Sequence, residues 1–245
     1  MKRRRKKNRY GKKILALAII FLFLLLAAGI ALSPMLKAKE INIYGNKEID
    51  SEEIKNNIQS INILLMTTNG LKNKLLKNFP KISAIEIRKN ILKRTIAVTI
   101  TERKGLGIIC KENIGNCFYI DKNGVIFEDA PQTSGSLILL IKDSSSEDFS
   151  LGKKILEEQI VGSIADFKEG LFSLTNIKIN WFEIYIHPPK ESKVITSEGW
   201  YLLLDLTRDI KKQLSILKTA LDEKIKDRKN LEYIDLRIEN RIYYK

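Results

Sequence analysis

Residues 79–104, FPKISAIEIRKNILKRTIAVTITERK, decide the fold class of this 245-residue chain. Two runs in this stretch alternate apolar and polar side chains, which is typical of strands with one buried face. The alternating apolar members are Ile85, Ile87, Ile96, Val98 and Ile100. Residues Lys89–Lys93 lie between the runs, so the stretch predicts two strands joined by a hairpin.

The residues before this hairpin complete a small domain. Residues 41–58, INIYGNKEIDSEEIKNNI, predict a short strand, a turn and a helix capped by Asp50. A second helix fits Asn69–Asn78 and stops at Pro80. The predicted order is β-α-α-β-β over residues 37–104, an α+β unit with two helices on a three-stranded sheet.

Residues 105–245 predict a strand-rich β domain with amphipathic helices. A helix is predicted over Lys153–Lys168, and a strongly amphipathic one over Arg208–Ile225, where apolar side chains recur every three or four residues. Two predicted strands, Tyr233–Ile238 and Arg241–Tyr244, close the sequence. The predicted fold class of the whole chain is therefore α+β.

An apolar stretch precedes both domains. Residues 14–36, ILALAIIFLFLLLAAGIALSPML, contain no charged side chain. As a helix they would be about 34 Å long, enough to cross a hydrocarbon core of about 30 Å. A cleaved signal peptide is the alternative, but its apolar region is usually shorter. The sequence predicts a single transmembrane helix.

Basic residues set the predicted orientation. Residues 1–13 contain nine Lys or Arg side chains and no acid, within a formal net charge of +14. Such clustering keeps this end in the cytoplasm and the following domains outside the cell membrane. A nucleic-acid-binding arm is the alternative interpretation, but topology and contact with anionic headgroups explain the charge more simply.

The residues that carry chemistry form no recognisable catalytic or metal site. The single histidine, His187, has no second histidine with which to bind a metal, and no G-x-S-x-G elbow or glycine-rich phosphate loop is present. The sequence therefore predicts no enzyme activity, no cofactor, no metal and no small-molecule substrate. Cys110 and Cys117 flank a predicted hairpin loop, where a disulfide and a pair of buried thiols both fit.

The closing strand suggests a binding function. An edge strand presents unpaired N–H and C=O groups, which can accept a strand from another protein by β-augmentation. Tyr243 and Tyr244 lie in this strand, where aromatic side chains fit either a core or an interface.

Four motifs together resemble the FtsQ/DivIB family of bacterial cell-division proteins. Residues 41–58 and 79–104 are similar to that family's POTRA domain. FYIDKNGVIFEDAP at 118–131 is similar to the hairpin that opens its β domain, and YIDLRIENRIYYK at 233–245 to its closing strand pair. The resemblance covers essentially the whole chain.

The resemblance implies a non-enzymatic scaffold at the division septum. It implies that the β domain binds the small single-span proteins FtsB and FtsL through its last strands, and that the POTRA domain contributes to recruitment. The matching partner-binding positions are Arg237, Ile238, Asn240, Tyr243 and Tyr244. Family members often carry an aromatic residue where this sequence has Ile238.

Two other functions share some of these features. A POTRA-bearing export or assembly factor that binds exported polypeptides would more often carry tandem copies of the small domain, and one copy is visible here. An exported enzyme on a membrane stalk would need a nucleophile or metal constellation.

Overall fold

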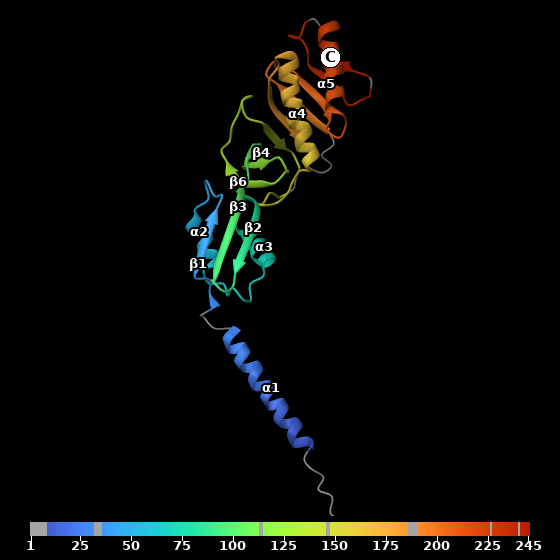
Figure 1. Cartoon of the computed structure of the whole chain (residues 1–245). Coiled ribbons are helices and arrows are strands. Elements are labelled where there is room, and N and C mark those ends of the chain that lie inside the picture. Colours follow the sequence, from blue (N-terminus) through green and yellow to red (C-terminus); the bar gives the residue numbers. More distant parts are fainter. Residues whose placement is uncertain are drawn as a thin grey trace, which may run out of the picture. The chain divides into compact units, whose positions relative to one another are not determined.

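The computed structural model of the protein describes residues 9–31, 36–112, 115–145, 148–185, 191–225, 227–239 and 241–245 (Figure 1). The chain divides into two compact units. The first comprises Met1–Asn78 and Ala84–Thr101, and the second comprises Phe79–Ser83 and Glu102–Lys245.

Helix α1 (Arg9–Ala31) contains most of the predicted transmembrane stretch, and its described apolar side chains between Ile14 and Leu26 are exposed. Among the described residues, no helix is both long enough and apolar enough to span a bilayer. The predicted transmembrane helix over 14–36 is therefore not found in the structure. Residues 1–8 of the predicted tail and 32–35 of the predicted span lie outside the described residues.

The small domain has the predicted order β-α-α-β-β. Its elements are β1 (Glu40–Tyr44), α2 (Ser51–Ile58), α3 (Thr68–Asn78), β2 (Ile82–Asn90) and β3 (Thr95–Glu102). The three strands form a sheet in the order β1-β3-β2, with β1 parallel to β3. Parallel strands need a long crossover, which α2, α3 and β2 provide. The Asp50 side chain accepts a hydrogen bond from the Glu52 N–H, which confirms the predicted helix cap.

The core of the small domain joins both helices to the sheet. Its fully or nearly fully buried side chains include Ile54, Ile58, Leu71, Leu75, Ile96, Val98 and Ile100. The inward residues of β3 are the ones that the alternating sequence pattern predicted.

The second unit is built on a mixed sheet. Its strands are β4 (Gly105–Lys111), β5 (Cys117–Asp121), β6 (Ile126–Ala130), β7 (Leu140–Asp143), β8 (Ile179–Ile184), β9 (Glu191–Thr196), β10 (Tyr201–Asp205), β11 (Tyr233–Asp235) and β12 (Tyr243–Tyr244). Across the described residues, they lie in the order β12-β11-β10-β9-β8-β7-β4-β5-β6. Three neighbouring pairs are parallel, β4 with β7, β7 with β8, and β10 with β11.

Two helices, α4 (Glu158–Thr175) and α5 (Ile210–Glu223), pack on this sheet (Figure 1). Buried side chains of both helices share one core with alternate residues of the strands. The largest of these buried side chains are Trp200, Phe167 and Phe182. Burial of a large apolar side chain stabilises a fold by about 1.5–3 kcal/mol, so this layer is a major source of stability.

The first predicted helix of the second unit is displaced along the chain. The prediction over Lys153–Lys168 is wrong at its start, because Lys154 forms a β-bridge with Val125 and the Ile155 N–H donates to the Gly124 carbonyl. The helix begins instead at Glu158 and ends at Thr175, and its C-cap residue Asn176 adopts a left-handed conformation.

A disulfide joins the first two strands of the second unit. Cys110 and Cys117 lie directly opposite each other on β4 and β5, with their Cα atoms 4.0 Å apart. It closes a short loop between the two strands.

The tight turn after β5 depends on Gly124. Both Asn123 and Val125 donate backbone N–H bonds to the Asp121 carboxylate, and Arg103 donates to the same group at 2.6 Å. Gly124 has φ +81°, and a Cβ there would lie 1.9 Å from the Leu156 carbonyl oxygen. Glycine is therefore required by conformation and by space.

Candidate partner-binding edge

The two outer strands of the large sheet differ in how far they are covered. On β6, the Gly152 N–H donates to the Ile126 carbonyl at 2.7 Å, and the Ile126 N–H donates to the Lys153 carbonyl at 3.2 Å. The 152–154 segment thus occupies part of that edge. Within the described residues, β12 pairs only with β11, so its other side has no strand beside it.

The hydrogen bonds of Lys245 reveal which backbone groups of β12 face outward. Lys245 and Tyr233 exchange two backbone bonds, each 3.2 Å long. In an antiparallel ladder such a pair alternates with a pair that exchanges none, and the next pair is Tyr244 with Ile234. The N–H and C=O of Tyr244 therefore point away from β11, toward the open edge.

The side chains around this edge are partly exposed. Tyr243 and Tyr244 are each 47% exposed, and Ile238 in the connection before β12 is 46% exposed. Ile242 is partly buried and packs against the main core. Asn240 lies outside the described residues. Aromatic and aliphatic side chains at such exposure supply apolar contact area to a partner.

Arg237 is held by ion pairs within the domain. Its guanidinium donates to both carboxylate oxygens of Asp235, at 2.9 and 2.7 Å, and to Glu191 on β9 at 2.7 Å. Its carbonyl accepts a bond from the Arg208 guanidinium at 2.6 Å. These bonds fasten the segment between β11 and β12 to the neighbouring strands.

The Arg237 contacts shift two pKa values. The hydrogen bonds that Arg237 donates to Asp235 have the largest effect on Arg237 and raise the pKa of its guanidinium. Burial alone would raise the pKa of Asp235, but the hydrogen bonds and the charge of Arg237 outweigh it, so the Asp235 pKa is lowered.

The free energy of unfolding should therefore depend on pH through the Asp235–Arg237 pair. An unfolded Asp titrates near pH 3.9. The pair stabilises the fold fully above that pH, and the stabilisation is lost as pH falls through the lower folded pKa. We expect Arg237→Ala to lower the free energy of unfolding by about 1–3 kcal/mol at pH 7. The difference from wild type should narrow below about pH 4.

Urea unfolding at pH 7 and pH 3, followed by tryptophan fluorescence, measures this difference. Lys245→Ala is the matched control, because it removes an exposed ion pair with Glu232 that contributes little. A loss of stability in Arg237→Ala that is the same at both pH values would contradict the assignment.

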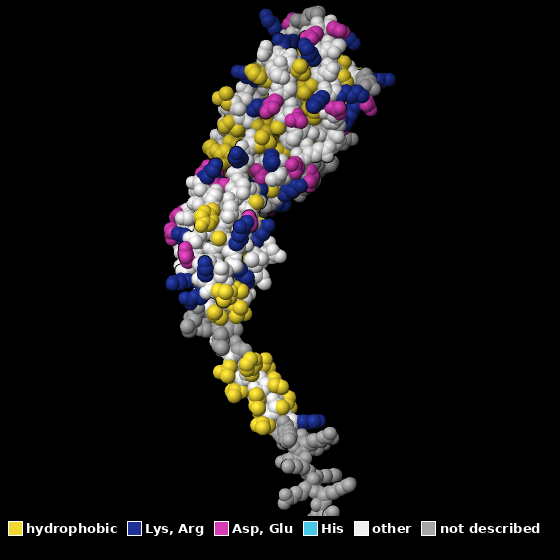
Figure 2. Space-filling view, viewed as in Figure 1, with side chains coloured by type: hydrophobic (Ala, Val, Ile, Leu, Met, Phe, Trp, Pro, Cys, Tyr) yellow, Lys and Arg dark blue, Asp and Glu magenta, His cyan; other side chains and the backbone are white. Residues whose placement is uncertain are grey.

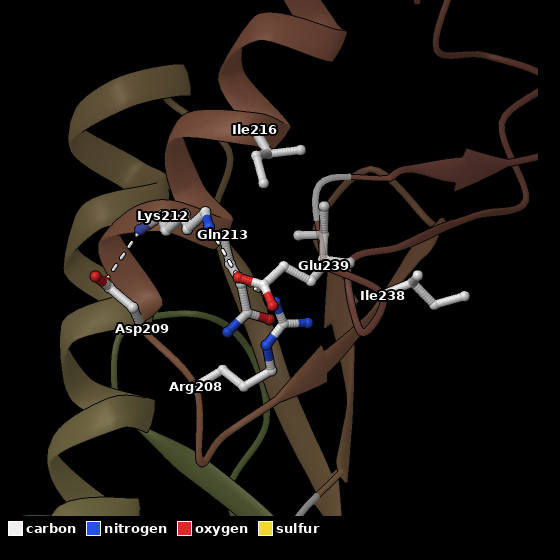
Figure 3. A pocket seen from close by; sticks show the side chains of 8 residues that line it. Arg208, Asp209, Lys212, Gln213, Ile216, Ile238 and Glu239 are labelled. Carbon is white, nitrogen blue, oxygen red and sulfur yellow. Dashed lines mark hydrogen bonds and ion pairs between the residues drawn. The ribbon is translucent and has the colours of Figure 1, made fainter.

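A small pocket adjoins the segment before β12. It measures about 170 Å³ and lies between the start of α5 and that segment (Figure 3). Its lining residues are Arg208, Asp209, Lys212, Gln213, Ile216, Leu236, Ile238 and Glu239. The Lys212 ammonium donates to the Glu239 carboxylate at 2.9 Å, and the Arg208 guanidinium lies 3.8 Å from the same carboxylate. The hydrogen bond from Lys212 lowers the pKa of Glu239, which favours the ionised form of this carboxylate at the pocket.

The sequence predicted some of the residues at the β12 edge but not the residues that hold Arg237. Arg237, Ile238, Tyr243 and Tyr244 all lie at or beside the β12 edge. The partners of Arg237 were not predicted. Asp235 could have been named, because the predicted strand Tyr233–Ile238 contains both residues, and residues two apart on a strand share a face. In the structure β11 ends at Asp235, and Arg237 follows it. Glu191 lies 46 residues away, and only the sheet order brings it close.

Comparisons with known proteins bear on both units. Residues 36–103 match the family model described as "POTRA domain, FtsQ-type". The chain is also 33% identical over 126 residues to the cell division protein DivIB of Clostridium acetobutylicum. This match covers 50% of the chain and 49% of that protein, so the chain spans about half the length of the curated relative that it matches. The FtsQ-type POTRA domain and a distant homology to DivIB, which the resemblance predicted, are confirmed.

Proposed function

We propose that this chain is a membrane-anchored, non-enzymatic scaffold of the bacterial division machinery. It links division partners for septal cell-wall synthesis through its extracytoplasmic domains. The observation that carries the proposal is the open β12 edge on a chain that also has an FtsQ-type POTRA domain. Homology to a cell division protein supports the cellular role.

The proposed mechanism of partner capture is β-augmentation at β12. The outward N–H and C=O of Tyr244 supply main-chain hydrogen bonds, which give affinity without a catalytic group. The exposed side chains of Tyr243, Tyr244 and Ile238 supply contact area. The proposed partners are small single-span division proteins similar to FtsB and FtsL.

Arg237 acts in this mechanism as a positioning residue. Its guanidinium is occupied by Asp235 and Glu191, so it holds the segment that leads into β12. Arg237→Glu would place a carboxylate beside two others and release this segment, which weakens capture indirectly.

The proposed anchor is the apolar stretch of residues 14–36, with the basic tail in the cytoplasm. Anchoring restricts the scaffold to the membrane plane, where single-span partners are also held. Restriction to one plane raises the effective concentration of partners, so a short edge suffices for capture.

Localisation of a fluorescent fusion at the N-terminus tests the division role. We expect a band at midcell in dividing cells, because the scaffold is recruited to the septum. A fusion that carries only residues 1–36 is the matched control, and it should label the membrane uniformly. Uniform labelling by the full chain as well would count against a role in division.

A further inference from the structure

We propose that one end of the POTRA domain inserts apolar side chains into the outer surface of an anionic membrane. This end, called the basal tip, consists of Leu64 and Leu65 from the loop after α2, and of Ile91 and Leu92 from the β2–β3 hairpin. The inference rests on the proposed membrane anchoring of the chain, and it adds a second contact with the bilayer.

The exposure of the basal tip is the first observation. Leu92 is 97% exposed, Leu65 56%, Leu64 44% and Ile91 42%. Figure 2 shows apolar side chains gathered at the lower end of this unit in that view. Single exposed leucines are ordinary on soluble proteins, but a contiguous group indicates an interaction surface.

Hydrogen bonds bring the two halves of the basal tip together. The Lys89 ammonium, at the end of β2, donates to the Met66 carbonyl at 2.6 Å and to the Ile63 carbonyl at 3.4 Å. Ile63 and Met66 themselves are buried, so the loop is fixed with Leu64 and Leu65 on its outside. The tip is therefore a defined surface made of two segments.

The basal tip lies where the chain enters the domain from the apolar stretch. The Ile63 N–H donates to the Leu36 carbonyl at 2.9 Å, and the Lys39 N–H donates to the Arg94 carbonyl at 2.8 Å. Leu36 is the last residue of the apolar stretch. From Ala31, the end of α1, a fully extended chain reaches Leu36 over at most about 18 Å. An anchor in the stretch thus holds the tip close to the bilayer.

The charges around the basal tip fit anionic headgroups. The basic residues in or beside the two segments are Lys37, which forms a β-bridge with Asn62, and Lys39, Lys93 and Arg94, against the acidic Glu40. Apolar side chains with a basic surround bind at a membrane surface through burial and through attraction to anionic lipids. A membrane is favoured over a protein partner because the chain joins the domain directly to the proposed anchor, which keeps the bilayer within reach of the basal tip.

A fluorophore at position 92 of the full chain tests the proposal. The cysteines Cys110 and Cys117 are joined in a disulfide, so Leu92→Cys supplies the thiol for an environment-sensitive NBD label. Glu53→Cys is the matched control, at an exposed site in the first turn of α2. Both proteins are reconstituted in vesicles of phosphatidylcholine and phosphatidylglycerol, with and without doxyl-labelled lipid.

We expect blue-shifted emission at position 92 and quenching by doxyl lipid several-fold stronger than at position 53. Leu64→Ser with Leu65→Ser should reduce the quenching at position 92, because half of the apolar surface is removed. Equal quenching at both positions, or none at position 92, overturns the proposal. A blue shift without lipid quenching also overturns it, since it indicates that protein covers the tip.

Flotation of the same vesicles separates this proposal from the anchoring on which it rests. Protein that floats with the vesicles is anchored, and the quenching then decides the role of the basal tip. Protein that stays at the bottom of the gradient refutes the anchor itself, and with it the tip contact.

Discussion

Replacing Tyr244 by proline should weaken partner binding at least about tenfold, which corresponds to about 1.4 kcal/mol. The Tyr244 N–H faces the open side of β12, as the Lys245–Tyr233 pair implies. Proline removes that donor and places its ring in the path of an incoming strand, but it leaves the bonds to β11 intact. Proline is tolerated on edge strands at such outward positions.

Tyr244→Ala is the matched control, because it removes the side chain and keeps the N–H. Affinity for an FtsB-like partner, measured by co-purification and by biolayer interferometry, should fall further for proline than for alanine. Deletion of Arg241–Lys245 should abolish binding. If the proline and alanine variants bind equally well, the partner does not use the backbone of this edge, and β-augmentation is refuted.

Replacing Gly124 by alanine should destabilise the second unit by about 3 kcal/mol or more. Two penalties add here. A positive φ costs a residue with a Cβ about 1–2 kcal/mol, and the new Cβ would lie 1.9 Å from the Leu156 carbonyl oxygen. The turn is held in place, because the Gly124 carbonyl also accepts a hydrogen bond from the Ile155 N–H.

Gly199→Ala separates the two penalties. Gly199 has φ +98°, but a Cβ there would meet nothing within 4 Å, so only the backbone penalty applies. Both tryptophans, Trp181 and Trp200, lie in the second unit, so their fluorescence during urea unfolding reports on that unit. If Gly124→Ala lowers the free energy of unfolding no more than Gly199→Ala does, the segment around Leu156 moves aside at little cost, and the steric penalty is refuted.

The sequence predicted local structure well where periodicity and a capping residue agreed. In the POTRA domain, Asp50 caps α2, and alternation in β3 separates buried from exposed side chains. These features depend on residues close in sequence, and the turn after β5 is similar, since Asp121, Asn123 and Gly124 act within one short segment.

Periodicity alone was insufficient at the start of α4. The prediction placed Ile155 in one helix with Ile160 and Ile164, and all three are buried. Yet Ile155 belongs to an extended segment beside β6, because the edge of the sheet offers hydrogen bonds there. Burial produces the same apolar pattern in both conformations, so the pattern could not distinguish them.

Sheet order was the other missing information. Strands β10 and β11 are neighbours in the sheet, although α5 separates them in the sequence. Strand β10 also pairs with β9, and this order brings Glu191 on β9 close to Arg237. Such long-range neighbours depend on the packing of the whole core. The role of Arg237 in fastening the segment before β12 therefore emerged only from the structure.

The position of β12 also has an evolutionary consequence. In the described part of the chain, this strand pairs with β11 alone, and its tyrosines stand outside the main core. Substitutions there change few interactions that hold the domain together, so selection on folding constrains them weakly. The recognition proposed at this edge could therefore change together with a partner, without any change in the core that supports it.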